Sequence, residues 1–181
     1  MAKKALIITS NAGVEHDELI KPLEFLKSKG IEAIHAAEKN EEVQTMKGDK
    51  EPGPAYTPDS TFEKVDPTDY DILIVPGGTV NADTLRINEQ VQQLIQHFTD
   101  NGKPIAMICH APWTLINAGR IEGKTVTGYQ SLELDLKNAG GLWKDEAVAY
   151  CKAHGWILIT SRNPGDLPEF NEAILKELEA A

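Results

Sequence analysis

Short apolar runs alternate along this chain with longer segments in which apolar residues recur at helical spacing. The runs lack the polar alternation of half-exposed strands, so they predict a parallel sheet covered on both faces. The predicted strands cover residues 4–9, 31–37, 71–75, 103–108, 124–127, 147–151 and 156–160, the last two as a hairpin. The predicted helices cover residues 17–28, 88–101, 111–119, 131–139 and 166–179. We expect a three-layer α/β/α sandwich with a mostly parallel sheet, in a single domain over residues 1–181.

Two segments depart from this alternation. Residues 46–61 are polar and rich in Pro and Gly, which predicts a loop-like excursion. Such a run could be a plain surface loop, part of a lid, or a subunit contact. Pro22 lies inside the first helical stripe, so that helix should either begin late or bend.

Composition narrows the function classes. The chain has 181 residues and a formal net charge of −10, which argues against nucleic acid and anionic membranes as partners. The same charge is also compatible with solubility alone. Two cysteines imply no disulfide framework, and no signal peptide or membrane-spanning run is recognisable, so we expect a cytoplasmic protein.

Cys109 and His110 stand where a predicted strand should turn sharply into a helix. A side chain on such a turn is strained and lies near the free N–H groups of the helix. A helix N-terminus and an imidazole both stabilise a thiolate, so we expect the pKa of Cys109 to lie below that of free cysteine. The pattern predicts a nucleophile, although a lone Cys at a strand end is more often a small buried hydrophobe. Cys151 lies in a strand with no acid or His in its run, and we expect it to be structural.

Loops after other strands carry groups that could complete a catalytic site. Gly77 and Gly78 could bring backbone N–H groups close to an oxyanion, although a Gly pair more often marks a plain turn. Glu15 could place a carboxyl beside the thiol, with a raised pKa, or could merely open an acidic helix start. Residues 161–164 follow a late strand. Parallel strands end at one edge of a sheet, so we expect these loops to lie together.

An ordered set of short motifs over nearly the whole chain resembles the PfpI family. This family is part of the DJ-one/PfpI branch of the class I glutamine amidotransferase-like fold. The motifs are Glu15 with residues 18–20, then residues 71–78, 85–88, 102–112, 138–140 and 160–167. Each motif is modest alone, but their order and spacing are specific. The resemblance implies a flavodoxin-like sheet and an elbow carrying the nucleophile.

The resemblance also implies roles for individual residues. The family nucleophile matches Cys109 and the adjoining His matches His110. A Glu of the first loop, which contacts the Cys in the family, matches Glu15. The family orients its His with an acid from a neighbouring subunit, which matches Asp83, or the position of Ala82 if the loop is shifted by one residue.

The implied oxyanion N–H groups are those of Gly78 and His110. An acid supplied in trans implies a homodimer or a larger homo-oligomer. Two positions depart from the family pattern: Ala111 replaces the usual Gly after the Cys-His pair, and Met107 is larger than the usual small residue. Both changes should tighten the elbow.

By resemblance, the chain is expected to be a cysteine-dependent hydrolase-like enzyme that attacks carbonyl carbons and protects against carbonyl or oxidative stress. Intracellular protease, glyoxalase and deglycase activities are all described in the family. The expected substrates are small carbonyl compounds, peptides or glycated groups, with no metal or organic cofactor. The alternative is a non-enzymatic redox sensor or chaperone-like stress protein that uses Cys109 as an oxidisable thiol.

Overall fold

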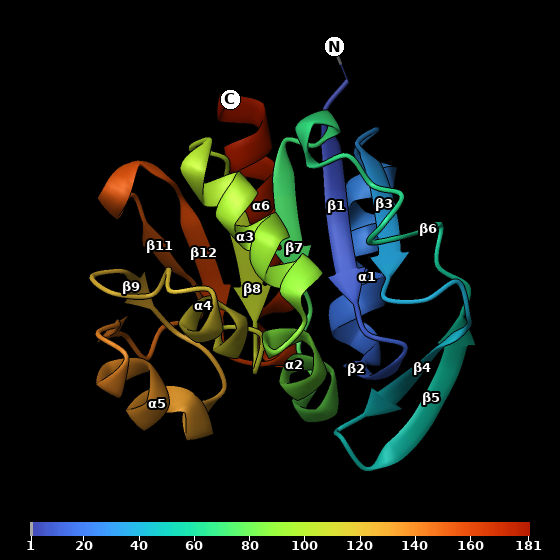
Figure 1. Cartoon of the computed structure of the whole chain (residues 1–181), viewed down its shortest axis with the longest axis horizontal. Helices are drawn as coiled ribbons and strands as arrows, with labels where there is room; N and C mark the ends of the chain where they lie inside the picture. The colour runs from blue at the N-terminus through green and yellow to red at the C-terminus, as the bar shows by residue number, and fades with distance from the viewer. Residues whose placement is uncertain (1) are drawn as a thin grey trace.

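A seven-stranded sheet runs through the centre of the computed structural model, which describes residues 2–181 (Figure 1). The strand order is β11-β12-β8-β7-β1-β3-β6, and every neighbouring pair is parallel except β11 with β12. The strands are β1 (Lys4–Thr9), β3 (Glu32–Ala37), β6 (Ser60–Thr61), β7 (Ile72–Val75), β8 (Ile105–Ile108), β11 (Ala149–Cys151) and β12 (Leu158–Ser161). The predicted mostly parallel α/β fold is confirmed, including the closing hairpin.

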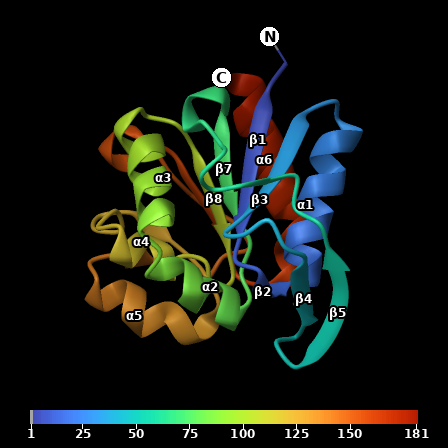
Figure 2. The same cartoon turned by 45° about the vertical axis from the view of Figure 1, so that its right-hand side comes forward.

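Helices cover both faces of this sheet (Figures 1 and 2). Side chains that alternate along the strands pack on one side against α1 and α6, and on the other against α2, α3 and α4. The strands therefore read as continuous apolar runs, because both of their faces are buried. The helices are α1 (His16–Ser28), α2 (Thr79–Arg86), α3 (Glu89–Asp100), α4 (Trp113–Asn117), α5 (Glu133–Asn138) and α6 (Leu167–Ala180).

The sequence locates most elements within a few residues, and the exceptions have local causes. Helix α1 passes through Pro22 instead of starting after it. Helix α4 begins at Trp113, two residues after the predicted start, and contains five residues where residues 111–119 were predicted. Helix α2 was not predicted at all, since its sequence mixes small polar residues with few apolar ones.

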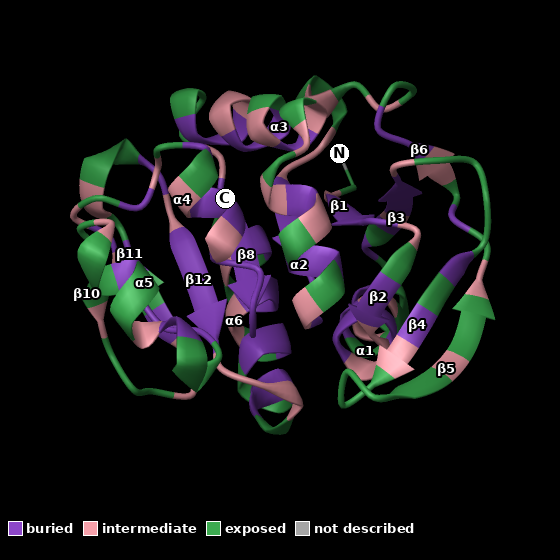
Figure 3. Ribbon diagram, turned by 60° about the horizontal axis from the view of Figure 1, so that its bottom comes forward, coloured by how far each residue is buried: buried purple, intermediate pink, exposed green. Residues whose placement is uncertain are grey.

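Residues 46–61 are not the expected loop. Residues 46–56 form the outer part of a three-stranded sheet of β2 (Ala12–Glu15), β4 (Val43–Lys47) and β5 (Glu51–Tyr56), and residues 60–61 are β6 of the main sheet. Strand β5 contains two prolines and is largely exposed, which an edge strand tolerates because one row of its N–H groups has no ladder partner (Figure 3). The β4–β5 hairpin projects from the end of the molecule where the main strands finish (Figure 1).

The remaining elements are short. Strands β9 (Thr125–Val126) and β10 (Leu142–Trp143) form a two-stranded parallel ladder beside α5. Single 3-10 turns lie at Pro67–Asp69, Gln130–Leu132, Ala153–Gly155 and Pro164–Asp166. Within residues 2–181, no helix has the length and apolar character needed to cross a bilayer.

Candidate active site

Cys109 lies directly after β8 in a left-handed backbone conformation, with a φ of 62°. Such an angle is costly for a residue with a Cβ and persists only where surrounding structure enforces it. The Cys109 N–H donates to the Ser161 carbonyl at 3.0 Å, and the Cys109 carbonyl accepts from the Tyr129 N–H at 2.7 Å. The predicted strained elbow is therefore confirmed, and the side chain there is 6 % exposed.

His110 forms a close pair with this thiol. Its Nδ1 lies 3.1 Å from the Cys109 Sγ, and its Nε2 lies 3.4 Å from the Thr79 Oγ1. The imidazole stacks on Tyr129 with ring centroids 4.6 Å apart, and the Trp113 ring meets it edge-on at 5.2 Å. These two aromatic rings thus fix the plane of the His110 imidazole, and with it the directions of its two nitrogens.

The carboxyl beside the thiol belongs to Glu18, and not to Glu15 as the sequence predicted. Glu18 lies in the first turn of α1 and is fully buried. Its Oε2 accepts from the Gly77 N–H at 2.7 Å, while Oε1 is buried without a hydrogen-bond partner. A Cβ on Gly77 would meet both the Cys109 Cβ and the Glu18 Oε2 at 2.6 Å, so all three residues converge at one point.

Glu15 faces away from the sulfur, toward the β4–β5 hairpin. Its two carboxylate oxygens accept from the Gly48 N–H at 2.9 and 3.2 Å. Burial raises the pKa of Glu15, and the Gly48 N–H opposes that rise. Glu15 ends strand β2 and Glu18 lies one helical turn later on the inner side of α1, which explains how two nearby acids reach different neighbours.

Gly77 and Gly78 have separate functions in the structure. The Gly77 N–H is already bonded to Glu18, so it is not free for an oxyanion. The backbone N–H groups of Gly78 and His110 face the Cys109 side chain and stabilise its thiolate form. Gly78 has a φ of 88°, and a side chain there would collide with the Gly13 carbonyl. Of the two predicted glycines, only Gly78 offers an N–H at the sulfur.

The thiol is not acidified in the way the sequence predicted. Burial raises the pKa of Cys109, and the neighbouring Glu18 carboxylate raises it further, against the opposing effect of the Gly78 and His110 N–H groups. The helix dipole is weak here, because α4 has five residues and starts four residues after the thiol. Burial and Glu18 thus oppose ionisation of the Cys109 thiol.

The pKa of Glu18 is raised to about 8, mainly by burial and in addition by the charge of Glu15, while the Gly77 N–H opposes the rise. At neutral pH, Glu18 is therefore largely a neutral carboxylic acid with a proton to donate. Burial lowers the pKa of His110, and the charge of Asp49 opposes this effect. Burial therefore disfavours the charged form of all three groups, which are the thiolate, the carboxylate and the imidazolium.

Two residues of this neighbourhood were not identified from the sequence as site residues. Asp49, at the tip of the β4–β5 hairpin, accepts from the Thr79 N–H at 2.9 Å and from the Thr79 hydroxyl at 2.7 Å. Glu18 could have been noticed, since it shares the i, i+4 spacing of Pro22 and Leu26, the buried side of α1. Asp49 carried no comparable signal, because hairpin register decides where it lies.

Asp83, the predicted orienting acid, is exposed on α2 and makes no recorded contact with His110 in the protomer. Its placement beside the His110 of another subunit stays a prediction. Ala82, the alternative position, is fully buried in α2. Of the predicted site residues, the structure brings together Cys109, His110 and the Gly77-Gly78 pair.

A cleft of about 840 Å³ is lined in part by Tyr129, whose ring stacks on His110. Its walls include Gly128, Trp143, Asp145 and Arg162. The Arg162 guanidinium is held by Asp166 and by Asp145, at 2.9 and 3.0 Å, so its charge is already neutralised. Neither Cys109 nor His110 lines this cleft, and Tyr129 is the residue that it shares with the surroundings of His110.

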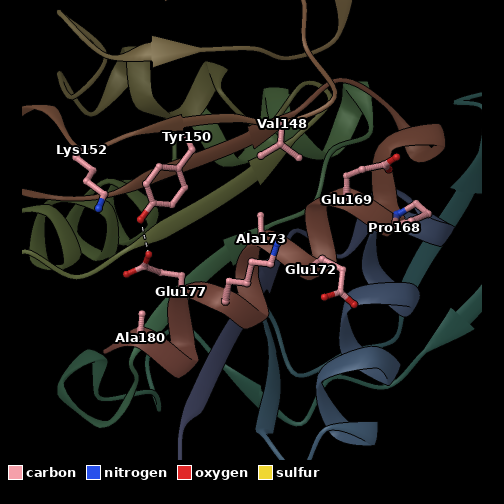
Figure 4. Close-up of a pocket in the computed structure, with 10 residues that line it drawn as sticks. Val148, Tyr150, Lys152, Pro168, Glu169, Glu172, Ala173, Glu177 and Ala180 are labelled. Atoms are coloured by element: carbon pink, nitrogen blue, oxygen red, sulfur yellow. Dashed lines mark hydrogen bonds between the residues drawn. The ribbon is translucent and has the colours of Figure 1, made fainter.

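A second hollow, of about 710 Å³, lies between β11 and α6 (Figure 4). Tyr150 crosses it and donates a hydrogen bond to Glu177 at 2.6 Å. None of the residues that line it belongs to the Cys109 cluster. Among residues 2–181, no three His, Cys, Asp or Glu side chains gather in a way that could hold a metal ion.

Comparison with known proteins gives a consistent result. The sequence profile of the DJ-1/PfpI family matches residues 3–177. General stress protein 18 of Bacillus subtilis is 36 % identical over 179 residues, covering 99 % of each chain. Deglycase TK1284 of Thermococcus kodakarensis is 35 % identical over 175 residues, covering 97 % of this chain and 99 % of its own.

The structural comparison agrees with the sequence comparison. The crystal structure of Drosophila melanogaster DJ-1beta superposes with a TM-score of 0.86 at 30 % identity, covering 98 % of this chain and 91 % of that one. The likeness extends over the whole sheet and its helices, and so includes the elbow that carries Cys109.

Proposed function

The chain belongs to the DJ-1/PfpI family, and from that premise we propose that it is a cysteine-dependent hydrolase that attacks carbonyl carbons, of the deglycase type. The observation that carries the proposal is the Cys109 Sγ–His110 Nδ1 distance of 3.1 Å, beside a buried carboxyl held by the Gly77 N–H. A thiol, a base in contact with it and a neutral acid are the groups that addition to a carbonyl requires.

In the first step, the thiol proton passes to His110 Nδ1 as the sulfur attacks the carbonyl carbon. Such coupled transfer suits this site, because a free thiolate is disfavoured by burial. The new C–S bond takes the sulfur electron pair, and the carbonyl π pair moves onto oxygen. General base help of this kind contributes roughly 10²- to 10⁴-fold.

The oxyanion formed in this step needs donors. The N–H groups of Gly78 and His110 adjoin the sulfur and are candidates for that function. Glu18 carries a proton at neutral pH and can hydrogen-bond to the adduct, or return the proton to it.

In a peptide, the nitrogen on the attacked carbon takes a proton from the His110 imidazolium as it departs, and water then hydrolyses the acyl–sulfur bond. In an early adduct, the amine or thiol takes a proton as the adduct collapses to the free dicarbonyl, whose aldehyde carbon the sulfur attacks. A proton shift from that carbon to the neighbouring carbonyl carbon converts the hemithioacetal to a hydroxyacyl thioester, which water hydrolyses to the hydroxy acid and the free thiol.

The proposed substrates are early adducts of dicarbonyls such as methylglyoxal on amines or thiols, together with the free dicarbonyl. The names of the relatives, a deglycase and a general stress protein, support this class. Peptide hydrolysis uses the same addition to a carbonyl, and it is the second activity to assay.

The test compares Cys109→Ala with Cys151→Ala, each of which removes one thiol. We expect Cys109→Ala to abolish methylglyoxal consumption and the release of free amines from glycated ones, while Cys151→Ala retains both. Both variants should keep the far-UV circular dichroism of the wild type. His110→Ala should lose roughly 10²- to 10⁴-fold. Full activity in Cys109→Ala would overturn the proposal.

The non-enzymatic alternative predicts a different result. A redox sensor would show stoichiometric oxidation of Cys109 by peroxide and no turnover of any carbonyl substrate. Peroxide reacts with thiolates, and burial in this site disfavours the thiolate. We therefore expect slow oxidation of Cys109 relative to its turnover of carbonyl compounds.

A further inference from the structure

The tip of the β4–β5 hairpin has a defined turn. Gly48 and Asp49 both have a φ of 61°, and the Lys50 N–H donates to the Lys47 carbonyl at 3.4 Å. Two successive positive φ values across a two-residue loop describe a type I′ turn, which suits a twisted hairpin. Asp tolerates this conformation better than most residues with a Cβ. The turn fixes where the Asp49 side chain points.

This tip is anchored to the main domain from two sides. The Gly48 N–H donates to Glu15, and the Asp49 carboxylate accepts from both the N–H and the hydroxyl of Thr79. Further back, His16 contacts the Tyr56 hydroxyl of β5 at 3.1 Å. The hairpin is thus fastened over the start of α2, beside the catalytic cluster.

A continuous chain of polar contacts leads from this tip to the sulfur. Asp49 Oδ2 lies 2.7 Å from Thr79 Oγ1, which lies 3.4 Å from His110 Nε2. His110 Nδ1 then lies 3.1 Å from Cys109 Sγ. We propose that Asp49, acting through the Thr79 hydroxyl, is the positioning residue of His110 and that it acts from within the same chain.

The direction of the hydrogen bonds follows from the donors available. A carboxylate only accepts, so the single Thr79 hydroxyl proton is donated to Asp49. The Thr79 oxygen can then only accept from His110, which selects the tautomer with its proton on Nε2. Nδ1 is left with a free lone pair toward the Cys109 thiol. When it receives the thiol proton, the Asp49 carboxylate stabilises the imidazolium charge.

Other groups around His110 do not offer this help. Tyr129 stacks on its face and Trp113 meets it edge-on, and Arg86 lies over the Trp113 ring, 5.0 Å from the ring centroid. Glu18 approaches from the sulfur side and is largely neutral at pH 7. Asp49 is the one charged group that favours protonated His110 in this environment.

Two competing explanations must be separated. Asp49 also accepts from the Thr79 N–H, so it could do no more than cap α2. An acid could instead come from another subunit, where Asp83 is the predicted residue. Thr79→Val distinguishes capping from positioning, because it keeps the N–H that Asp49 caps and removes only the hydroxyl that reaches His110.

The proposal rests on the proposed function, so its first readout does not depend on turnover. In ¹⁵N-histidine-labelled protein, the two ring nitrogen shifts of His110 report its tautomer. We expect Thr79→Val to reduce the fraction protonated on Nε2, Thr79→Ser to restore it, and Asp49→Asn to lower the pKa of His110. If Cys109→Ala kept activity, the proposed function would fail, yet these spectra would still decide the positioning role.

The second readout is kinetic. We expect Thr79→Val to reduce kcat by roughly 10- to 100-fold, part of the value of general base help, with KM nearly unchanged and Thr79→Ser near wild type. The matched control is Thr68→Val, since Asp66 accepts from the Thr68 N–H and hydroxyl at 2.9 and 2.7 Å with no His110 beyond. A wild-type His110 tautomer and kcat in Thr79→Val would overturn the proposal. A loss of kcat and a shifted His110 titration in Asp83→Asn, but not in Asp49→Asn, would do so too.

Discussion

Cys109 and Cys151 are equally buried, both 6 % exposed, and both lie at the ends of strands. Their electrostatic surroundings are opposite. Cys109 lies beside the Glu18 carboxyl, and burial together with that acid raises its pKa. At Cys151 the effect of burial is outweighed, because the Ala153 and Thr125 N–H groups and the Lys124 ammonium stabilise the thiolate and lower its pKa.

The backbone and the neighbouring side chains, in contrast, favour Cys109 as the nucleophile. Cys109 occupies a strained turn with an imidazole in contact, whereas Cys151 pairs in the antiparallel β11–β12 ladder with no imidazole bonded to it. The more acidic thiol is therefore the one without a base. Reactivity toward a carbonyl depends on a positioned proton acceptor, and a low resting pKa alone does not identify the nucleophile.

We expect the largest effect from Glu18, the acid beside Cys109, on the pH dependence of the free energy of unfolding. Glu18 has a folded-state pKa of about 8 against an ordinary value of 4.5, so folding disfavours its charged form. The free energy of unfolding should fall as pH rises between these two values, by at most about 1.4 kcal/mol per pH unit. Glu18→Gln, measured by urea denaturation at pH 5, 6.5 and 8, should flatten that slope.

Glu169→Gln is the control for this experiment, because Glu169 also lies in the first turn of a helix but is exposed. Its free energy of unfolding, plotted against pH, should run parallel to that of the wild type. If the Glu18→Gln and wild-type curves also run parallel, Glu18 is not held neutral by the fold.

The next effect concerns packing at the two cysteines. A Cβ at Gly77 would approach the Cys109 Cβ and Glu18 Oε2 at 2.6 Å, and neither is free to move far. We expect Gly77→Ala to cost about 1–3 kcal/mol of stability and to abolish turnover. Near Cys151, Gly155 has a φ of 79° but open space around it, so Gly155→Ala should cost about 1–2 kcal/mol and leave turnover intact. Equal turnover in the two variants would contradict this difference.

The smallest effect concerns which of the two thiols ionises at the lower pH. Alkylation rates followed against pH by mass spectrometry should give Cys151 the lower apparent pKa and Cys109 the higher one. Glu18→Gln removes the carboxylate charge and should lower the apparent pKa of Cys109 by roughly one unit, leaving Cys151 unchanged. An apparent pKa of Cys109 below that of Cys151 in the wild type would show that His110 and the backbone N–H groups dominate over burial.

The sequence by itself determined the sheet, because its strands are buried on both faces and appear as uninterrupted apolar runs. It also determined the elbow, since Cys109-His110 directly follows such a strand and a turn there leaves few conformations. The hairpin at residues 43–56 was missed, because an exposed edge strand with Pro52 and Pro54 lacks the pattern of a strand.

Only the tertiary structure decided which acid serves which group. Glu15 and Glu18 are three residues apart, and the angle at which α1 leaves β2 sends one to the hairpin and the other to the thiol. Asp49 reaches Thr79 across thirty residues because a type I′ turn and the docking of the hairpin place it there. The pKa of Cys109 likewise depends on burial and on Glu18, both created by packing, which is why a motif that located the nucleophile could not predict its charge.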